Sequence, residues 1–201
     1  MGDLLLASQN PGKLNEMRVL LQGLPFRVVG PRDLGIHEAP DEYGETFLEN
    51  ATIKALAYAR ISGYLTVADD SGLSVDALGG EHGLYSRRFG GEGASDLERN
   101  LLLLEKLDGL PFEMRGAQFT SAVVAARTDE VLFQAVETVH GLIADQMRGE
   151  SGFGYDPLFY YPPYGKTFGE VPREQKDRVS HRGKAFARLR AFLAGLPRDD
   201  Q

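Results

Sequence analysis

The stretch TVADDSGLSVDAL, residues 66–78, is an apolar run interrupted by two adjacent acids, Asp69 and Asp70. The apolar residues predict a buried strand, and Ser71-Gly72 predicts a turn into a second strand. Burying an unpaired carboxylate costs several kcal/mol or forces it to take a proton. Either one acid caps the turn, or the pair has a partner or a chemical purpose. Because neighbours on a strand point to opposite faces, we expect the two acids to do different jobs.

Around this stretch, strand and helix patterns alternate. Strand-like runs occupy 3–8, 26–29, 117–127 and 131–139. Helix-start patterns occur at Asn10-Pro11, Thr46 to Glu49, Ser95 to Glu98 and Ser180. The two later runs flank Thr128-Asp129-Glu130 and predict a hairpin. A hairpin after alternating elements favours an α/β fold with a mixed sheet over a purely parallel one.

Composition sets the broad class. With 201 residues, 42% of them hydrophobic, the chain suits one large domain or two closely packed lobes. It has no cysteine, which excludes disulfides and thiolate metal sites and fits a reducing compartment. No run approaches the roughly 20 apolar residues of a membrane span, and the N-terminus does not have the pattern of a signal peptide. We therefore expect a soluble, cytoplasmic protein with no membrane partner.

Charge is unevenly distributed. The net charge of -7 argues against a nucleic-acid partner, because phosphate backbones bind mainly to lysine and arginine. Residues 173–190 nevertheless hold seven bases and two acids, whereas residues 38–49 hold five acids and no base. This pattern suits a metal and an anionic ligand. Two solvated faces of opposite sign would explain it equally well.

The segment SQNPGK, residues 8–13, predicts a phosphate site at a strand-to-helix junction. A helix N-terminus offers free backbone N–H groups, Gly12 permits close approach, and Lys13 adds a cation. An ordinary capped helix with a surface lysine is the alternative. The GKT at 165–167 is not a P-loop, because a proline-rich turn precedes it and the first glycine of that motif is missing.

Two further segments could bind a base. SGFGYDP, residues 151–157, could stack an aromatic ring on a base and hydrogen-bond its edge, or could be a tight turn with buried aromatics. KDRVSHR, residues 176–182, places His181 and Arg182 at the start of the last helix. The remaining histidines have no zinc-ligand spacing, and no GxSxG elbow occurs. Asp69 or Asp70 with an acid from residues 38–49 would suit Mg²⁺.

Taken in order, five motifs resemble those of the inosine triphosphate pyrophosphatase family, the non-standard purine nucleoside triphosphate pyrophosphatases. The match extends over nearly the whole chain, with SQNPGK at 8–13, EYGETFLENATIKA at 42–55, ADDSGLSVDALGG at 68–80, SGFGYDPLF at 151–159 and KDRVSHR at 176–182. The resemblance implies an elongated, two-lobed α/β fold with a long mixed β-sheet flanked by helices and a central cleft. It also implies a homodimer.

The resemblance further implies hydrolysis of ITP, dITP and XTP to the monophosphate and pyrophosphate with Mg²⁺, which removes deaminated purines from the nucleotide pool. Glu42 and Asp70 would bind the metal, and Asp70 would also accept a proton from the attacking water. The phosphates would be held by Ser8, Gln9, Asn10, Pro11, Gly12, Lys13 and Lys54, with Ser71 nearby. The base would be surrounded by Phe153, Gly154, Tyr155, Asp156, Lys176, His181 and Arg182.

Base preference follows from hydrogen-bond chemistry. Inosine and xanthine present an N1–H donor and an O6 acceptor, so Asp156 as acceptor, with donors near His181 and Arg182, would favour the 6-oxo purine over adenine. Each unpaired group would cost roughly 1–3 kcal/mol. The chain departs from the family at His82 and Arg87, and at Gln175-Lys176-Asp177, where Asp177 adds negative charge.

Two alternatives remain open on sequence. A Maf-type pyrophosphatase would act on modified pyrimidine nucleotides. A nucleotide-binding or RNA-binding module would use the basic segment 173–190 without catalysis, but would leave Glu42, Asp69 and Asp70 unexplained.

Overall fold

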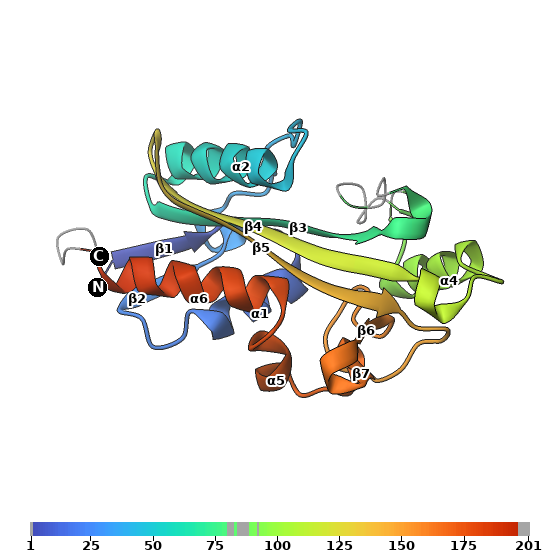
Figure 1. Cartoon of the computed structure of the whole chain (residues 1–201). Coiled ribbons are helices and arrows are strands. Elements are labelled where there is room, and N and C mark those ends of the chain that lie inside the picture. The colour runs from blue at the N-terminus through green and yellow to red at the C-terminus, as the bar shows by residue number, and fades with distance from the viewer. Residues whose placement is uncertain (1, 80–82, 84–88, 92, 197–201) are drawn as a thin grey trace. The chain divides into compact units, whose positions relative to one another are not determined.

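The structure is a computed structural model that describes residues 2–79, 83, 89–91 and 93–196 (Figure 1). Within these residues, seven strands form one sheet in the order β2-β1-β3-β4-β5-β6-β7. Their bounds are β1 Gly2–Leu6, β2 Phe26–Val29, β3 Leu65–Val75, β4 Gly116–Arg127, β5 Glu130–Ile143, β6 Phe159–Tyr161 and β7 Lys166–Thr167. β1 is parallel to β2 and β3, whereas β6 is antiparallel to β5 and β7. The predicted mixed sheet is confirmed. His82 and Arg87 lie outside the described residues.

The described helices are α1 Pro11–Leu20, α2 Phe47–Ser62, α4 Asp96–Lys106, α5 Arg173–Asp177 and α6 His181–Ala194. Short 3-10 helices are η1 Pro31–Leu34, η2 Asp76–Leu78, η3 Phe112–Met114, η4 Pro162–Tyr164 and η5 Phe168–Glu170. The predicted caps are present at Asn10 and Thr46, and Ser95 forms a full capping box with Glu98. At α2 the Glu49 carboxylate accepts from the Glu45 N–H at 2.7 Å, one residue before the cap.

The turn predicted at Ser71-Gly72 is wrong. β3 continues through both residues to Val75 as a single 11-residue strand, and the chain turns only in η2. Serine and glycine are common in turns, but tertiary packing of the strand overrides this local preference. Leu73 and Val75 are fully buried. Since there is no turn at Ser71-Gly72, neither Asp69 nor Asp70 caps a turn at this point.

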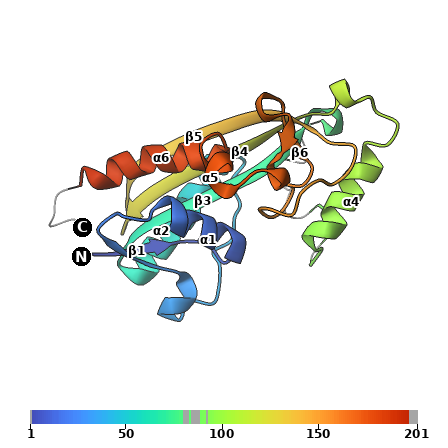
Figure 2. The same cartoon turned by 90° about the horizontal axis from the view of Figure 1, so that it is seen from below.

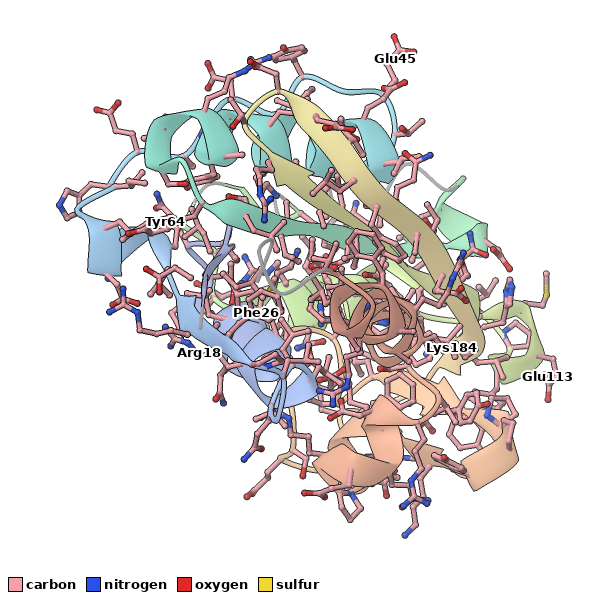
Figure 3. All side chains as sticks on the ribbon, turned by 90° about the vertical axis from the view of Figure 1, so that its left-hand side faces the viewer. Arg18, Phe26, Glu45, Tyr64, Glu113 and Lys184 are labelled. Carbon is pink, nitrogen blue, oxygen red and sulfur yellow. The ribbon has the colours of Figure 1, made fainter. Side chains whose placement is uncertain are left out.

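The chain divides into two compact units. Unit 1 comprises the described residues of Met1–Asp70, Ser121–Glu137 and Arg182–Gln201. In it α2 covers one face of the sheet, and α1 and α6 cover the other (Figure 1 and Figure 2). Figure 3 shows Phe26 directed into this unit, whereas Arg18 and Glu45 point away from it. The sheet alternates accordingly, with Leu5 packed beneath α2, and Leu4 and Leu6 beneath α1 and α6.

Helix faces in unit 1 match the sequence periodicity. Ala51, Ala55 and Tyr58 of α2 are buried, with Phe47 packed at their edge. The inward side chains of α1 and α6 are Met17, Ala185, Phe186, Leu189 and Leu193, all fully buried. These layers fix where α1 and α6 begin, which positions the charged residues described below.

Unit 2 comprises the described residues of Ser71–Thr120 and Thr138–His181. Its core is rich in aromatic rings: Phe119 lies 4.6 Å from Phe159, and Phe159 lies 4.9 Å from Phe168, measured between ring centroids. α4 packs on this core through Leu103.

None of the helices in the described residues is both long and apolar enough to cross a membrane. The central cleft stays a prediction.

Candidate active site

Asp69 and Asp70 point to opposite faces of β3, as the strand geometry predicts. Asp69 lies two residues after Val67 and therefore on the same face of β3, the face packed under α1 and α6. Asp70 lies two residues after Ala68, on the face packed under α2. The two acids consequently meet different partners. All of these residues belong to unit 1.

Asp69 is the centre of a buried ion-pair network and is 1% exposed. Its Oδ2 atom lies 3.0 Å from Lys13 Nζ and 3.3 Å from Arg182 Nη2. Its Oδ1 atom accepts a hydrogen bond from Ser121 Oγ at 2.6 Å. Arg182 also pairs with the buried Glu16 carboxylate of α1. The network thus joins α1, β3, β4 and α6, and it supplies the partners that a buried carboxylate requires.

These partners decide the protonation state of Asp69. Burial by itself would raise the pKa of Asp69, but the charges of Arg182 and Lys13 and the Ser121 hydrogen bond outweigh it. The pKa of Asp69 is therefore held well below its ordinary value of 3.8. Burial lowers the pKa of Lys13; the Asp69 carboxylate opposes this, while Arg182 and Lys54 add to it.

The predicted phosphate segment forms the start of α1. The Asn10 side chain accepts from the Lys13 N–H at 3.1 Å, and Ser8 Oγ accepts from the Asn10 N–H at 3.2 Å. Pro11 occupies the first helical position, with Gly12 following it. Gln9 donates instead to the carbonyl of His37 at 2.8 Å. The segment is a capped helix start with a lysine beside it, the geometry that suits an anion.

Asp70 faces a second group of charges on the α2 side of β3. Lys54 Nζ lies 2.7 Å from Glu42 Oε1 and 3.6 Å from Asp70 Oδ1. Burial raises the pKa of Asp70, and the negative charges of Glu42 and Asp69 raise it further. The positive charges of Lys13 and Lys54 lower it, but the pKa of Asp70 remains above its ordinary value. Burial by itself would lower the pKa of Lys54. The negative charges of Asp70 and Glu42 outweigh this effect, so the pKa of Lys54 is raised.

Glu42 is brought to Lys54 by a close approach of the acidic loop to α2. The Gly44 N–H donates to Asn50 Oδ1 at 2.8 Å, and a Cβ on Gly44 would lie only 2.7 Å from Glu49 Cβ. Glycine is needed here because no larger residue would fit without moving the loop. Glu42 and Asp70, two oxygen donors from different segments, therefore lie close to the same lysine. Mg²⁺ binds through one or two carboxylates of this kind together with substrate phosphates.

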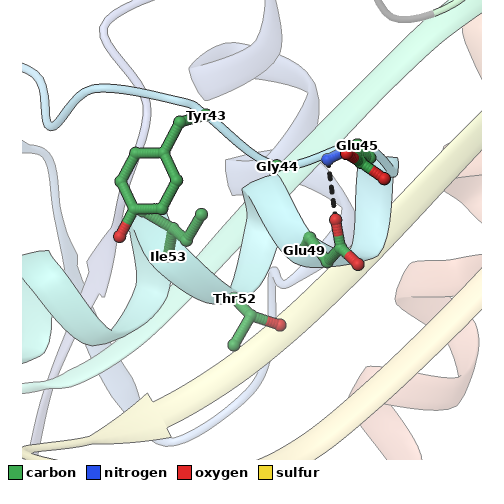
Figure 4. A pocket seen from close by; sticks show the side chains of 6 residues that line it. All are labelled: Tyr43, Gly44, Glu45, Glu49, Thr52 and Ile53. Atoms are coloured by element: carbon green, nitrogen blue, oxygen red, sulfur yellow. Dashed lines mark hydrogen bonds between the residues drawn. The ribbon is translucent and has the colours of Figure 1, made fainter.

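A surface pocket lies beside this loop but contains none of the predicted site residues (Figure 4). Its lining is Tyr43, Gly44, Glu45, Glu49, Thr52 and Ile53. Within it the Glu49 carboxylate is already hydrogen-bonded to the backbone of the loop. The chemistry-bearing groups are thus the charges around Asp69 and Asp70, and the hydrogen bonds of Gly44 and Glu45 hold the loop against α2.

The predicted base-binding residues fall into both units. In unit 2, Asp156 Oδ2 accepts from Lys176 Nζ at 2.6 Å and from the Phe153 N–H at 2.9 Å. Lys176 Nζ also lies 5.4 Å from the centre of the Phe153 ring. A Cβ on Gly152 would overlap the Asp156 carboxyl group. This atom of Asp156 thus orders its own loop, and reading of the base edge by Asp156 stays a prediction.

The remaining predicted residues have defined positions. The His181 ring stacks on Phe119 at 4.7 Å and is 3% exposed. Tyr155 is buried, and Gly154 has a left-handed backbone with φ of 63°. Ser71 lies half-buried in β3. Arg182 belongs to unit 1, with its guanidinium group on Asp69 and Glu16, and its proposed contact with the base stays a prediction.

Sequence reasoning missed two members of the Asp69 network, Glu16 and Ser121. Glu16 follows Lys13 by three residues, so the two share a side of α1, and an acid beside the apolar Met17 was a usable signal. Ser121 lies inside the long apolar strand β4 and carries no local signal. Asp177, which departs from the family pattern, has Oδ2 3.7 Å from Arg173 Nε.

The Ser121 hydrogen bond can be tested through stability. Ser121→Ala should lower the free energy of unfolding by about 1.5–3 kcal/mol, the range for a hydrogen bond to a charged group. Because the folded-state pKa of Asp69 is depressed, its contribution is fully present above 3.8 and is lost as the pH falls toward the folded-state value. The deficit should hold from about pH 5 to about pH 8 and shrink only in stronger acid.

Denaturant unfolding measured across pH checks this, with Ser62→Ala as the matched control. The Ser62 hydroxyl donates to the neutral carbonyl of Tyr58 at 2.7 Å and accepts from the Tyr64 N–H at 3.1 Å, so its loss should not depend on pH in this range. A Ser121→Ala deficit that stays constant in strong acid, as in the control, would contradict the role given to Ser121.

Comparison with known proteins agrees with this geometry. Residues 4–192 match the Ham1 family. A dITP/XTP pyrophosphatase of Thermus thermophilus is 47% identical over 194 residues, which cover 96% of this chain and 93% of that protein. The dITP/XTP pyrophosphatase of Geobacter sulfurreducens is 44% identical over 193 residues, which cover 96% and 97%.

Solved structures give the same result. A HAM1 protein from Coxiella burnetii has a TM-score of 0.85 and 36% identity, covering 98% of this chain and all of that one. The Ham1 protein of Staphylococcus aureus has a TM-score of 0.81 and 40% identity, covering 96% of this chain and 98% of that one. The resemblance seen in the motifs is confirmed, and the chain belongs to the Ham1 family.

Proposed function

We propose that the chain hydrolyses the non-standard purine nucleoside triphosphates dITP, XTP and ITP to the monophosphate and pyrophosphate. One observation carries this proposal: Asp70 and Glu42 share Lys54, while on the other face of β3 Lys13 is held beside the capped start of α1. Carboxylates beside cations and a helix N-terminus suit phosphoryl chemistry, in which the protein mainly positions groups and offsets charge. The names of its relatives support the substrate class.

The triphosphate would be held by the start of α1, with Lys13 and Lys54 as cations. Both lysines are largely buried, so their attraction to phosphate oxygens is screened less than on an open surface. Burial and neighbouring cations lower the pKa of Lys13, and an incoming anion would oppose those effects. Lys13 would therefore hold its proton more tightly once phosphate is bound.

Mg²⁺ fits the oxygen donors Glu42 and Asp70, since it binds through one or two carboxylates together with substrate phosphates. When bound, it would offset phosphate charge and orient the triphosphate. Among the described residues, no third side chain of a metal-binding type joins this pair, so the substrate would complete the site. Lys54 holds the two carboxylates in place.

Asp70 would accept a proton from the water that attacks the α,β-phosphoanhydride. The new P–O bond forms as the bond to the bridging oxygen breaks, and pyrophosphate leaves. In the metal-free protein the pKa of Asp70 is raised above the ordinary aspartate value and that of Asp69 is lowered, so Asp70 is the better proton acceptor of the two. In unit 2 the Phe153 to Asp156 loop, Lys176 and His181 would bind the base.

A homodimer and a cytoplasmic location stay predictions; the homodimer is implied by the resemblance of the sequence motifs to the pyrophosphatase family.

Substrate choice tests the proposal directly. With Mg²⁺, ITP, dITP and XTP should each release pyrophosphate far faster than ATP, because adenine presents the wrong hydrogen-bond pattern at N1 and at position 6. The assay must separate pyrophosphate from orthophosphate and should include dTTP and UTP. Release of orthophosphate alone, equal rates with ATP, or a preference for dTTP or UTP would overturn the proposal.

Asp70→Asn tests the assignment of the proton acceptor. The amide keeps the size of the side chain but cannot take the proton, so kcat should fall at least about 100-fold. Asp129→Asn is the control: it changes an ion pair with Arg60 that is exposed on both sides. Circular dichroism and thermal unfolding should show both variants folded. A fully active Asp70→Asn enzyme would contradict the role of Asp70.

A further inference from the structure

Helix α4 holds both backbone polar groups of Gly154 in the loop 151–157. The Gly154 N–H donates to Asp96 Oδ2 at 2.8 Å, and the Gly154 carbonyl accepts from Asn100 Nδ2 at 2.8 Å. Asp96 and Asn100 are four residues apart, so they lie on one side of the helix. Figure 2 shows α4, in yellow-green, in the part of unit 2 where these contacts occur. The family motifs do not include either residue.

Asn100 is a rigid member of this contact. Its side-chain amide is buried, at 3% exposure, and also donates to the Asp96 carbonyl at 2.8 Å. Both protons of the amide group are therefore used, which fixes the orientation of the side chain. Asp96 is in turn held by Arg99, whose Nη2 lies 2.6 Å from Asp96 Oδ1.

The contact falls next to Phe153. The Phe153 N–H is bound by Asp156 Oδ2, and Gly154 follows it directly with a left-handed backbone. The backbone on both sides of the Phe153 ring is thereby attached, through Asp156 on one side and α4 on the other. The ring itself is half-buried beside the Lys176 ammonium group.

The start of α4 does not need these contacts for its own capping. Ser95 and Glu98 already form a complete capping box, in which Ser95 Oγ accepts from the Glu98 N–H and the Glu98 carboxylate accepts from the Ser95 N–H. Asp96 and Asn100 are thus additional polar groups of the same helix turn, and both bond to one loop residue, Gly154.

We propose that Asp96 and Asn100 are positioning residues that set the Phe153 ring for stacking on the purine base. This inference rests on the proposed function, in which the loop binds the base. Base stacking requires a ring whose position is fixed before the substrate arrives, because ordering it on binding costs affinity. Loosening Gly154 should therefore weaken substrate binding while leaving the groups around Asp70 unchanged.

The test uses Asn100→Ala, Asp96→Ala and the conservative Asp96→Asn, with Glu98→Ala as the matched control. Glu98→Ala breaks the capping box in the same turn but touches no residue of the loop. Steady-state kinetics with ITP gives KM and kcat, and amide hydrogen exchange followed by mass spectrometry reports on residues 151–157. Circular dichroism verifies folding. If Asn100→Ala does not fold, Asp96→Ala and Asp96→Asn still provide the test. The Asp96 side chain is 48% exposed, so its replacement leaves no buried cavity.

We expect exchange in the loop to speed up and KM to rise roughly five- to tenfold in Asn100→Ala and Asp96→Ala, the range for one lost hydrogen bond. We expect kcat to change less than about twofold, because chemistry at Asp70 is unaltered. Asp96→Asn keeps an oxygen acceptor for the Gly154 N–H, so it should restore most of the wild-type KM. Glu98→Ala should match the wild type in KM.

Unchanged loop exchange in the alanine variants would overturn the inference, as would faster exchange with an unchanged KM. A rise in KM with Glu98→Ala equal to that of Asp96→Ala would overturn it too, since helix stability alone would then explain the effect. A wild-type enzyme that releases no pyrophosphate from ITP would instead contradict the proposed function, and the role of the loop in base binding with it.

Discussion

The buried carboxylate of Asp69 is the interaction on which the rest of unit 1 depends. At 1% exposure it has lost its hydration, and the combined effect of Lys13, Arg182 and Ser121 keeps it ionised. Removing one partner would leave charge buried without compensation, which is strongly destabilising. These partners come from α1, β4 and α6, so a single carboxylate connects the starts of two helices to the sheet.

The geometry of one strand then separates two adjacent acids. Because side chains alternate along β3, Asp70 faces Lys54 and Glu42 instead of the Asp69 network. Opposite environments produce opposite results: the pKa of Asp69 is lowered by its cations, whereas burial raises that of Asp70. A site with one permanently charged anchor and one acid able to exchange a proton follows from two consecutive residues, and two such carboxylates with divergent pKa values are typical of catalytic centres.

Sequence could predict what depends on local patterns. Asn10, Thr46 and Ser95 cap their helices as the helix-start patterns predict. It failed at Ser71-Gly72, where packing of the extended strand outweighs turn preference. It also missed Ser121 and the pairing of Glu16, because Ser121 and Asp69 are 52 positions apart and Glu16 and Arg182 are 166 apart. Such contacts exist only once the sheet has assembled.

The different protonation of the two acids can be measured without any substrate. Carbon-13 NMR titration of the aspartate side-chain carboxyl groups in the metal-free protein, assigned with Asp69→Asn and Asp70→Asn, reports each pKa separately. Asp69 should stay ionised well below the ordinary value of 3.8, whereas Asp70 should take up a proton above it. Asp69 titrating at or above 3.8, or Asp70 titrating below it, would contradict the separation of roles along β3.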